Sequence, residues 1–321
     1  MRVISIDPFV RLDEVGRRAA RPHHLDCIGD ETDPTAVEVV LTAGVGLPRQ
    51  MLRSMPNLIE VITAGTGIDH LELDALQEAG VAVTNVPGYC TEEVSDHAVA
   101  LTCALFRSLP SFLVDARAAW ESPEGIGVKR FSSVHAGVLG TGRIGRAICR
   151  KLAALGMRVS VATRPDSRHA VGAVPGAELG VLDEILPKLD VLIVASPGSV
   201  GEAPLLGRAA LDRMLPGAFL VNVSRASLVD LQAMQEHLQE GRLAGAYFDV
   251  WDPEPPTDFG RLAEVPGLFI SPHSGWYSPD SADELWARIA ERLDELSGLK
   301  KRPSRSSLMS ADECGGAVHS N

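Results

Sequence analysis

Cysteines and long hydrophobic runs are scarce in this sequence, and both scarcities narrow the classes of protein it can belong to. The chain has five cysteines, an odd number, and no two of them form a Cys-x-x-Cys pair, so neither a disulfide framework nor a zinc site is indicated. No apolar run reaches the roughly 18 residues that a membrane span needs. Asp7 and Pro8 come too early for the N-terminus to hold the apolar region of a signal peptide. We therefore expect a reduced, cytoplasmic protein.

Basic side chains are also in the minority, with 30 Lys and Arg against 42 Asp and Glu and a formal net charge of −12. Nucleic acids and anionic membranes bind clusters of Lys and Arg, so we expect neither as the main partner. The histidines show no metal-ligand spacing, and we predict no metal site. Apolar residues make up 45% of the 321 residues, which is ordinary for a globular protein, and the length favours about two domains.

Short β-branched runs alternate with amphipathic stretches, a pattern typical of βα units and a parallel sheet in an α/β fold. In the first part of the chain we predict strands at 3–6, 37–42, 58–63 and 81–84, with helices at 71–79 and from near 91 to about 109. In the second part we predict strands at 135–139, 158–162, 191–195, 218–223, 244–248 and 268–270, with helices at 143–154, 231–239 and 282–296. From Ser297 onward Ser, Gly and basic residues dominate, and we expect a disordered tail over 298–321, with a basic interaction arm as the alternative.

A glycine-rich loop joins a predicted strand to a predicted helix. Gly140, Gly142 and Gly145 form a Gly-x-Gly-x-x-Gly pattern, with Arg143 and Ile144 between the last two glycines. In dinucleotide-binding proteins the first glycine allows a tight turn, the second lets backbone approach a pyrophosphate, and the third lets helix and strand pack closely. The N–H groups of the helix start favour phosphate. We predict a dinucleotide site, the alternative being a merely structural turn.

The next predicted strand ends at Thr163, about 20 residues beyond the loop, where NAD enzymes usually carry an acid for the ribose 2′-hydroxyl. Here no acid stands at the strand end, and Arg164 follows. Because Thr163 and Arg164 could hydrogen-bond a 2′-phosphate, we favour NADPH over NADH. In the alternative, Arg164 points to solvent and Asp166 or Ser167 meets the ribose.

Three segments late in the chain, 222–225, 249–255 and 271–276, each follow a predicted strand. Ligands of open parallel sheets bind at the carboxyl ends of the strands, so these segments are expected to meet there. They bring Arg225, Glu254 and His273, which together suit carbonyl reduction. Arginine can grip a carboxylate and polarise the adjacent carbonyl, and histidine can donate a proton with a carboxylate fixing its tautomer. Taken singly, each residue could be an ordinary surface or turn residue.

With these motifs in their order, the sequence resembles the D-2-hydroxyacid dehydrogenase family from about residue 58 to 296. Segments 64–70, 85–88 and 92–98 carry the resemblance together with the glycine loop and the three late segments. The resemblance implies two Rossmann-like doubly wound domains with a cofactor and substrate cleft between them. It places the substrate domain at 1–99, completed by 281–297, and the dinucleotide-binding domain at 100–280. It also implies a homodimer, paired through the nucleotide domain.

The resemblance also implies roles for residues that meet the substrate. Arg225 would bind the substrate's carboxylate and keto oxygen. His273 would be the acid/base, with Glu254 as its paired carboxylate. The turn of Gly65, Thr66 and Gly67 is similar to the loop whose backbone amides cradle the substrate carboxylate.

For the cofactor, the resemblance implies a contact between Asp249 and the nicotinamide carboxamide. Backbone at Val223 and Ser224 would line the nicotinamide pocket. Pro197 and Ser199 match the loop beside the adenosine, although Gly198 departs from the family's usual residue there.

One departure bears on specificity. Trp276 follows the catalytic histidine in a His-Ser-Gly-Trp segment that is similar to the C-terminal-binding-protein corepressors, so it could contact the substrate side chain and favour an apolar or thioether group. The alternative is that Trp276 only packs. The loop at 42–46 is uncharged and offers no partner for a second anionic group.

We therefore predict an NAD(P)-dependent 2-hydroxyacid dehydrogenase acting on a small 2-keto or 2-hydroxy acid. The alternatives are a corepressor-like nucleotide sensor with vestigial catalysis and an oxidoreductase that oxidises a specialised hydroxy compound such as a phosphonate.

Overall fold

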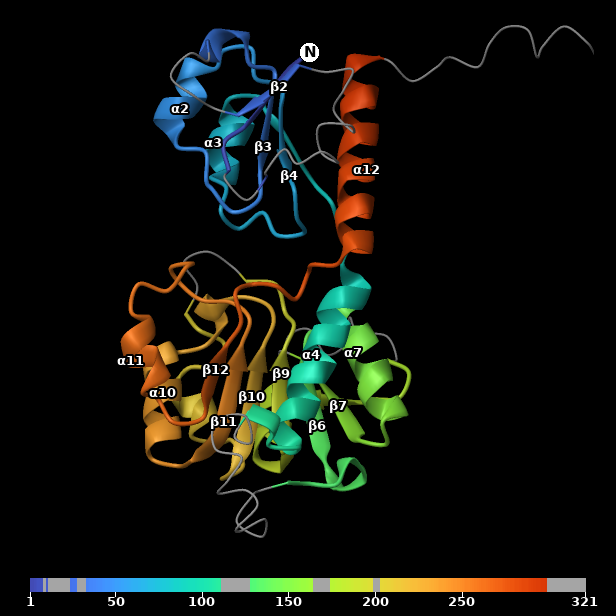
Figure 1. Ribbon diagram of the computed structural model, residues 1–321, viewed down its shortest axis with the longest axis vertical. Helices are drawn as coiled ribbons and strands as arrows, with labels where there is room; N and C mark the ends of the chain where they lie inside the picture. Colours follow the sequence, from blue (N-terminus) through green and yellow to red (C-terminus); the bar gives the residue numbers. More distant parts are fainter. Residues whose placement is uncertain are drawn as a thin grey trace, which may run out of the picture. The chain divides into compact units, whose positions relative to one another are not determined.

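The structure is a computed structural model that describes residues 1–7, 10, 24–27, 33–110, 128–163, 174–198 and 203–298 (Figure 1). The described chain forms two compact units. The first comprises Met1–Gly65, Leu71–Val86 and Asp283–Asn321, and the second comprises Thr66–His70 and Pro87–Ala282. Of the predicted features, Arg164, Ser199 and the tail beyond residue 298 lie outside the described residues.

The first unit is built on a five-stranded parallel sheet with the order β2-β1-β3-β4-β5. Its strands are β1 (Arg2–Ser5), β2 (His24–Cys27), β3 (Val39–Thr42), β4 (Glu60–Thr63) and β5 (Ala82–Asn85). Its short helices are a 3₁₀ turn at Pro34–Ala36, α2 (Arg49–Ser54) and α3 (Leu73–Glu78). The central strands are buried, and Ile4, Val40 and Val61 pack with Leu76 of α3 in one apolar core.

Helix α12 (Pro279–Ser297) supplies the last element of the first unit from Asp283 onward. Arg292 on this helix grips Glu60 of β4 with two hydrogen bonds, Nε to Oε1 at 2.9 Å and Nη2 to Oε2 at 2.8 Å. The Glu60 side chain is only 1% exposed, so this pair joins the helix to the sheet through a carboxylate that is shielded from water.

The second unit holds a seven-stranded parallel sheet with the order β12-β11-β10-β9-β6-β7-β8. Its strands are β6 (His135–Leu139), β7 (Arg158–Thr163), β8 (Glu178–Val181), β9 (Val191–Val194), β10 (Ala218–Asn222), β11 (Leu243–Phe248) and β12 (Leu268–Ile270). Its α-helices are α4 (Thr91–Phe106), α7 (Arg143–Ala154), α8 (Leu182–Ile185), α9 (Arg208–Leu211), α10 (Leu231–Gln239) and α11 (Phe259–Ala263). Three 3₁₀ turns lie at Phe131–Ser133, Leu186–Lys188 and Ala226–Leu228.

Both faces of this sheet are covered, as parallel sheets require. One core joins strand residues to α4 and α7, and within it Phe106 meets Phe219 edge to face at 5.1 Å. The other core joins the opposite face to α8, α9 and α10 and includes Met234 and Phe248. Figure 1 shows α4 and α7 on one side of the sheet and α10 and α11 on the other. Helices on both faces leave the strand ends as the place for loops that carry chemistry.

The observed elements follow the predicted α/β pattern closely, with differences that have local causes. Helix α4 ends at Phe106 rather than near 109, because Ser108 has a positive φ of 52° that an α-helix cannot accommodate. Helix α12 begins at Pro279, three residues earlier than predicted, where Ser278 caps it by accepting the N–H of Ser281 at 2.9 Å. Strands β2 and β8 were not predicted. Each is a four-residue edge strand of mixed polarity, without the apolar run of the central strands. No helix among the described residues is long and apolar enough to cross a membrane.

Candidate active site

The glycine loop lies between β6 and α7, as predicted, and each of its glycines meets a different environment. A Cβ atom on Gly140, whose φ is +138°, would lie 2.4 Å from the carbonyl oxygen of Ala195. A Cβ on Gly145 would lie 2.1 Å from the carbonyl oxygen of Gly140. Gly142 caps α7 and faces open space, and no side chain of the described residues caps this helix. The loop thus packs tightly on the sheet and presents bare backbone at the helix start, which fits a dinucleotide pyrophosphate.

The other residues predicted for the cofactor lie at or near this end of the sheet, where the structure describes them. Arg143 is the first residue of α7 and is exposed, whereas Ile144 is half-buried against the core beneath. Thr163 is the last residue of β7, and Pro197 is exposed in the loop after β9.

The turn after β10 is held by a buried asparagine. The side chain of Asn222 is fully buried, its Oδ1 accepts the N–H of Ser224 at 3.0 Å, and its Nδ2 donates to the carbonyl oxygen of Arg225 at 2.8 Å. The hydroxyl of Ser224 donates to the carbonyl oxygen of Ser196, which ties this turn to the loop after β9. The backbone at Val223 and Ser224, predicted to line the nicotinamide pocket, is therefore rigidly positioned. Our sequence analysis assigned no role to Asn222.

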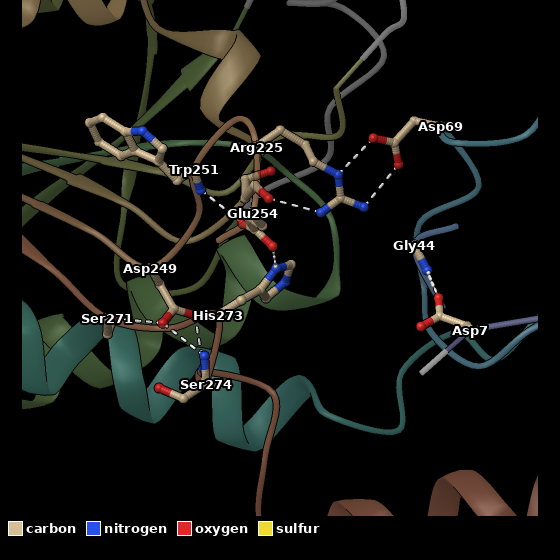
Figure 2. A network of polar contacts seen from close by, with 12 residues as sticks. Asp7, Gly44, Asp69, Arg225, Asp249, Trp251, Glu254, Ser271, His273 and Ser274 are labelled. Carbon is tan, nitrogen blue, oxygen red and sulfur yellow. Dashed lines mark hydrogen bonds and ion pairs between the residues drawn. The ribbon is translucent and has the colours of Figure 1, made fainter. Parts of the chain in front are cut away.

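Arg225 is paired with a residue that was not predicted for the site. Its Nε atom donates to Oδ2 of Asp69 at 2.7 Å and its Nη2 atom to Oδ1 at 2.9 Å, while Nη1 donates to the carbonyl oxygen of Ser224 at 2.8 Å (Figure 2). Burial opposes ionisation of Asp69, but the hydrogen bonds and charge of Arg225 outweigh it, so the pKa of Asp69 lies below its ordinary value. Asp69 is thus a carboxylate throughout the neutral range.

The predicted turn of Gly65, Thr66 and Gly67 is divided between the two units, and Gly67 is the member that lies against Arg225. A Cβ atom on Gly67 would come within 1.8 Å of Nη2 of Arg225. Thr66 is exposed, and Gly65 follows β4, where its N–H donates to the carbonyl oxygen of Thr63 at 2.8 Å.

His273 and Glu254 form the predicted pair. Nδ1 of His273 lies 2.7 Å from Oε2 of Glu254, and Oε1 of Glu254 accepts the N–H of Trp251 at 2.8 Å (Figure 2). An ionised carboxylate only accepts hydrogen bonds, so Nδ1 carries the proton and Nε2 is the nitrogen that can face a substrate. The two side chains are 44% and 36% exposed, which leaves the pair accessible.

The segment that carries His273 is held from below by Asp249. The Asp249 side chain is buried and accepts hydrogen bonds from Ser271 Oγ at 2.6 Å, Ser274 N at 3.0 Å and Gly275 N at 2.8 Å (Figure 2). Nε2 of His97, on α4, lies 3.3 Å from the same carboxylate. Burial raises the pKa of Asp249, but these four groups together lower it by more, so the pKa lies below its ordinary value. Asp249 therefore binds residues on both sides of His273. The segments of Asp249 and His273 were predicted to meet, but these hydrogen bonds and the contact with His97 were not predicted.

Trp276 lies in an aromatic group. Its ring is half-buried, 6.3 Å from the ring of Tyr89 and 5.4 Å from that of Tyr277. Tyr89 is buried and Tyr277 is 61% exposed, so the group runs from the interior of the second unit to its surface.

Chemically, this end of the sheet combines a cation that can bind a carboxylate with an imidazole whose second nitrogen is held by a carboxylate. Such a set can bind an anionic carbonyl compound and move a proton to or from its oxygen. Among the residues described, no group of three or more His, Cys, Asp or Glu side chains is arranged to hold a metal ion.

A seven-stranded parallel sheet with a glycine loop after its first strand defines the class of Rossmann-type dinucleotide-binding proteins. Residues 99–275 match the family described as "D-isomer specific 2-hydroxyacid dehydrogenase, NAD binding domain". The chain belongs to the D-isomer specific 2-hydroxyacid dehydrogenase family. The predicted family and fold class are thereby confirmed.

Curated relatives agree with this assignment. The chain is 30% identical over 272 residues to a putative 2-hydroxyacid dehydrogenase of Haemophilus influenzae, and the match covers 81% of this chain and 84% of that protein. It is 32% identical over 261 residues to D-3-phosphoglycerate dehydrogenase of Mycobacterium tuberculosis, covering 81% of this chain and 49% of that protein. The chain thus spans about half the length of the phosphoglycerate dehydrogenase.

Solved structures show the same two-domain fold. An NAD-dependent formate dehydrogenase from Staphylococcus aureus in complex with NAD superposes with a TM-score of 0.82 at 21% identity, covering 95% of this chain and 98% of that one. An NADPH-dependent glyoxylate/hydroxypyruvate reductase from Sinorhizobium meliloti, in complex with NADP and malonate, gives 0.79 at 25% identity, covering 94% and 95%.

Proposed function

We propose that this chain is an NAD(P)-dependent 2-hydroxyacid dehydrogenase that interconverts a small 2-keto acid and the corresponding 2-hydroxy acid. The observation that carries this proposal is the 2.7 Å pair between His273 Nδ1 and Glu254, which reserves Nε2 for proton transfer. The second unit also places Arg225, a cation suited to a carboxylate, in the turn after β10.

In the proposed reaction, Arg225 binds the carboxylate of the keto acid and polarises its carbonyl oxygen. When bound, the reduced nicotinamide supplies a hydride to the carbonyl carbon. His273 in its doubly protonated imidazolium form gives the proton on Nε2 to the carbonyl oxygen, so that one hydride and one proton convert the ketone to an alcohol and leave a neutral imidazole with its proton on Nδ1. Glu254 keeps the imidazole in the correct tautomer and stabilises its charged form. In the opposite direction, neutral His273 removes the proton from the hydroxyl group.

For the cofactor, we assign the pyrophosphate to the loop of Gly140, Gly142 and Gly145 and to the start of α7. Arg143 and Ile144 belong to this first turn. The backbone of Val223 and Ser224 would border the nicotinamide, with Asp249 beside its carboxamide. Pro197 and Ser199 would lie beside the adenosine.

Within this proposal the preferred cofactor is NADPH. The support is the sequence at the end of β7, where Thr163 and Arg164 stand and no acid is present to repel a 2′-phosphate. The named relatives include both an NAD-dependent and an NADPH-dependent enzyme, so the family accommodates either cofactor. We also propose a cytoplasmic homodimer without nucleic-acid or membrane partners, in keeping with the acidic composition.

For the substrate, we propose an apolar or thioether side chain, because Trp276 and its aromatic neighbours offer an apolar surface in the second unit. The loop after β3 carries no charged side chain that could pair with a second anionic group. Within the first unit, Oδ2 of Asp7 already accepts the N–H groups of Ala43, Gly44 and Val45 at 2.9, 2.7 and 3.0 Å. Figure 2 shows the contact with Gly44.

The test is the change in absorbance at 340 nm when purified protein and NADPH or NADH meet a panel of 2-keto acids. The panel runs from glyoxylate and hydroxypyruvate to phenylpyruvate and a thioether keto acid. We expect NADPH oxidation that is lost in His273→Ala. Faster turnover with NADH would contradict the cofactor preference alone. Tight nucleotide binding without turnover of any of these acids would contradict the proposed 2-keto acid reduction. It would favour a corepressor-like sensor, which the His-Ser-Gly-Trp segment suggests, or oxidation of a specialised compound such as a phosphonate.

A further inference from the structure

We propose that Asp69 is a positioning residue for Arg225, holding the Nε and Nη2 edge of the guanidinium group so that the adjacent, end-on N–H pair is the one offered to the substrate carboxylate. This inference rests on the proposed function, because it concerns how the same site binds its substrate.

The hydrogen bonds of Arg225 determine which edge of its guanidinium group can bind a substrate. A guanidinium carries five N–H donors: one on Nε and two on each Nη. Asp69 takes the donor on Nε and one on Nη2, and the carbonyl oxygen of Ser224 takes one on Nη1. Within the described residues, one N–H on Nη1 and one on Nη2 remain, and together they form the end-on fork that matches a carboxylate. The Arg225 side chain is 33% exposed, which allows a ligand to reach this fork.

The surroundings hold the guanidinium in this orientation. The backbone of Gly67 lies so close that a Cβ there would come within 1.8 Å of Nη2, and a Cβ on Gly198 would lie 3.0 Å from Cγ of Arg225. The side chain is thus confined near both its stem and its head, while Asp69 fixes its rotation. Figure 2 shows Asp69 on one side of the guanidinium and Glu254 with His273 on the other, which is where a substrate held by Arg225 would meet the acid/base.

The ion pair with Asp69 also orders Arg225 before the substrate binds. An arginine without a fixed partner would keep a mobile side chain and lose rotamer freedom when substrate binds. The bidentate pair with Asp69 already orders the Arg225 side chain in the free protein, so this loss of rotamer freedom does not occur on substrate binding. The substrate then binds a preorganised fork, which strengthens binding and fixes the angle of the carbonyl group.

The decisive variant is Asp69→Asn, in which the amide nitrogen cannot accept an N–H of Arg225. The probe is oxamate, a non-reacting analogue of a small 2-keto acid, titrated calorimetrically into full-length protein saturated with NADPH, or with NADH if that binds more tightly. We expect the Kd of oxamate to rise about 10- to 100-fold, as for a misplaced anchor. The Kd of the nucleotide alone should stay within about twofold, because Asp69 contacts Arg225 and not the glycine loop.

Glu178→Gln is the matched control, because it also removes one carboxylate paired with an arginine of the second unit. Glu178, on the edge strand β8, makes a 2.7 Å contact with Arg158 of β7. It should leave both Kd values unchanged. Should Asp69→Asn fail to fold, Asp69→Glu keeps the charge but displaces the carboxylate. It should weaken oxamate binding by a smaller factor while nucleotide binding is retained.

Oxamate affinity that is unchanged or higher in these Asp69 variants would overturn the proposal, because Asp69 would then be neutral or a competitor of the substrate. Equal losses of oxamate and nucleotide affinity would also overturn it, since the substitution would then disturb the whole protein. A wild-type protein that binds nucleotide but no oxamate would overturn it as well. Failure of the proposed function looks different. In that case the wild-type protein turns over no 2-keto acid, while the oxamate comparison still reports on Asp69.

Discussion

Glu254 binds His273 with one carboxylate oxygen and the backbone of Trp251 with the other, at 2.7 and 2.8 Å. The acid that orients the imidazole is therefore itself fixed to the segment that follows β11. Because the Glu254 carboxylate is already held in place, it loses little conformational freedom when His273 becomes charged. This suits repeated proton transfer by His273. The requirement for two acceptors also makes Glu254 sensitive to substitution by an isosteric amide.

Glu254→Gln should therefore lower kcat on the best keto acid by about 10- to 100-fold, and His273→Ala by about 10²- to 10⁴-fold. Glutamine has one acceptor oxygen, so it cannot accept from both His273 and Trp251. The measurement is steady-state kinetics at 340 nm, together with nucleotide Kd, which should stay within about twofold. Asp252→Asn, an exposed carboxylate nearby, is the control and should behave as wild type. Wild-type kcat in Glu254→Gln would show that the pair has no catalytic role.

The glycine loop offers two substitutions of the same size with opposite consequences. Gly142→Ala should fold normally, because its Cβ would meet nothing within 4 Å, yet the methyl group stands where a pyrophosphate is expected. Gly145→Ala should lower the free energy of unfolding by about 1–3 kcal/mol, because its Cβ would meet the carbonyl oxygen of Gly140 at 2.1 Å. We expect the first variant to lose nucleotide affinity at unchanged melting temperature. The idea that this loop binds nucleotide would be wrong if Gly142→Ala bound it as tightly as wild type.

Asp249 gives a prediction about pH. Its pKa is lowered in the folded protein by the groups around it, so its ionised form stabilises the fold above the unfolded pKa, about 3.9. That contribution is lost as the pH falls through the lower, folded pKa. Asp249→Asn should therefore cost about 2 kcal/mol at pH 7, since an amide cannot accept from every donor it faces, and less near pH 3. Urea unfolding at both pH values measures the difference, with Asp252→Asn as control. An equal cost at both pH values would mean that charge is not involved.

Sequence alone located the residues whose signal is local. The glycine motif of Gly140 to Gly145 runs into the first turn of a helix that was predicted with its observed bounds, and Arg225, Glu254 and His273 each follow a predicted strand. Asp69 and His97 carry no such signal, because their partners are far along the chain. Asp69 lies 156 positions from Arg225, and His97 lies 174 positions from Ser271. A single Asp in a loop or a single His on a helix has many ordinary explanations, and pairing over such distances is decided by the fold.

The pair of Arg292 and Glu60 yields a prediction about stability, independent of catalysis. Arg292→Met removes both hydrogen bonds to a carboxylate that is 1% exposed, leaving a buried charge without its partner. We expect this to lower the free energy of unfolding by about 2–3 kcal/mol. This is at the low end of the cost of breaking a buried ion pair, because Arg292 itself is 35% exposed. Arg288→Met on the same helix breaks an exposed pair with Glu284, in which the side chains are 42% and 47% exposed, and it should cost no more than about 0.5 kcal/mol. Urea unfolding followed by circular dichroism compares the two variants. Similar costs for both would show that burial of Glu60 does not matter, whereas a large gap would place the anchor of α12 at β4.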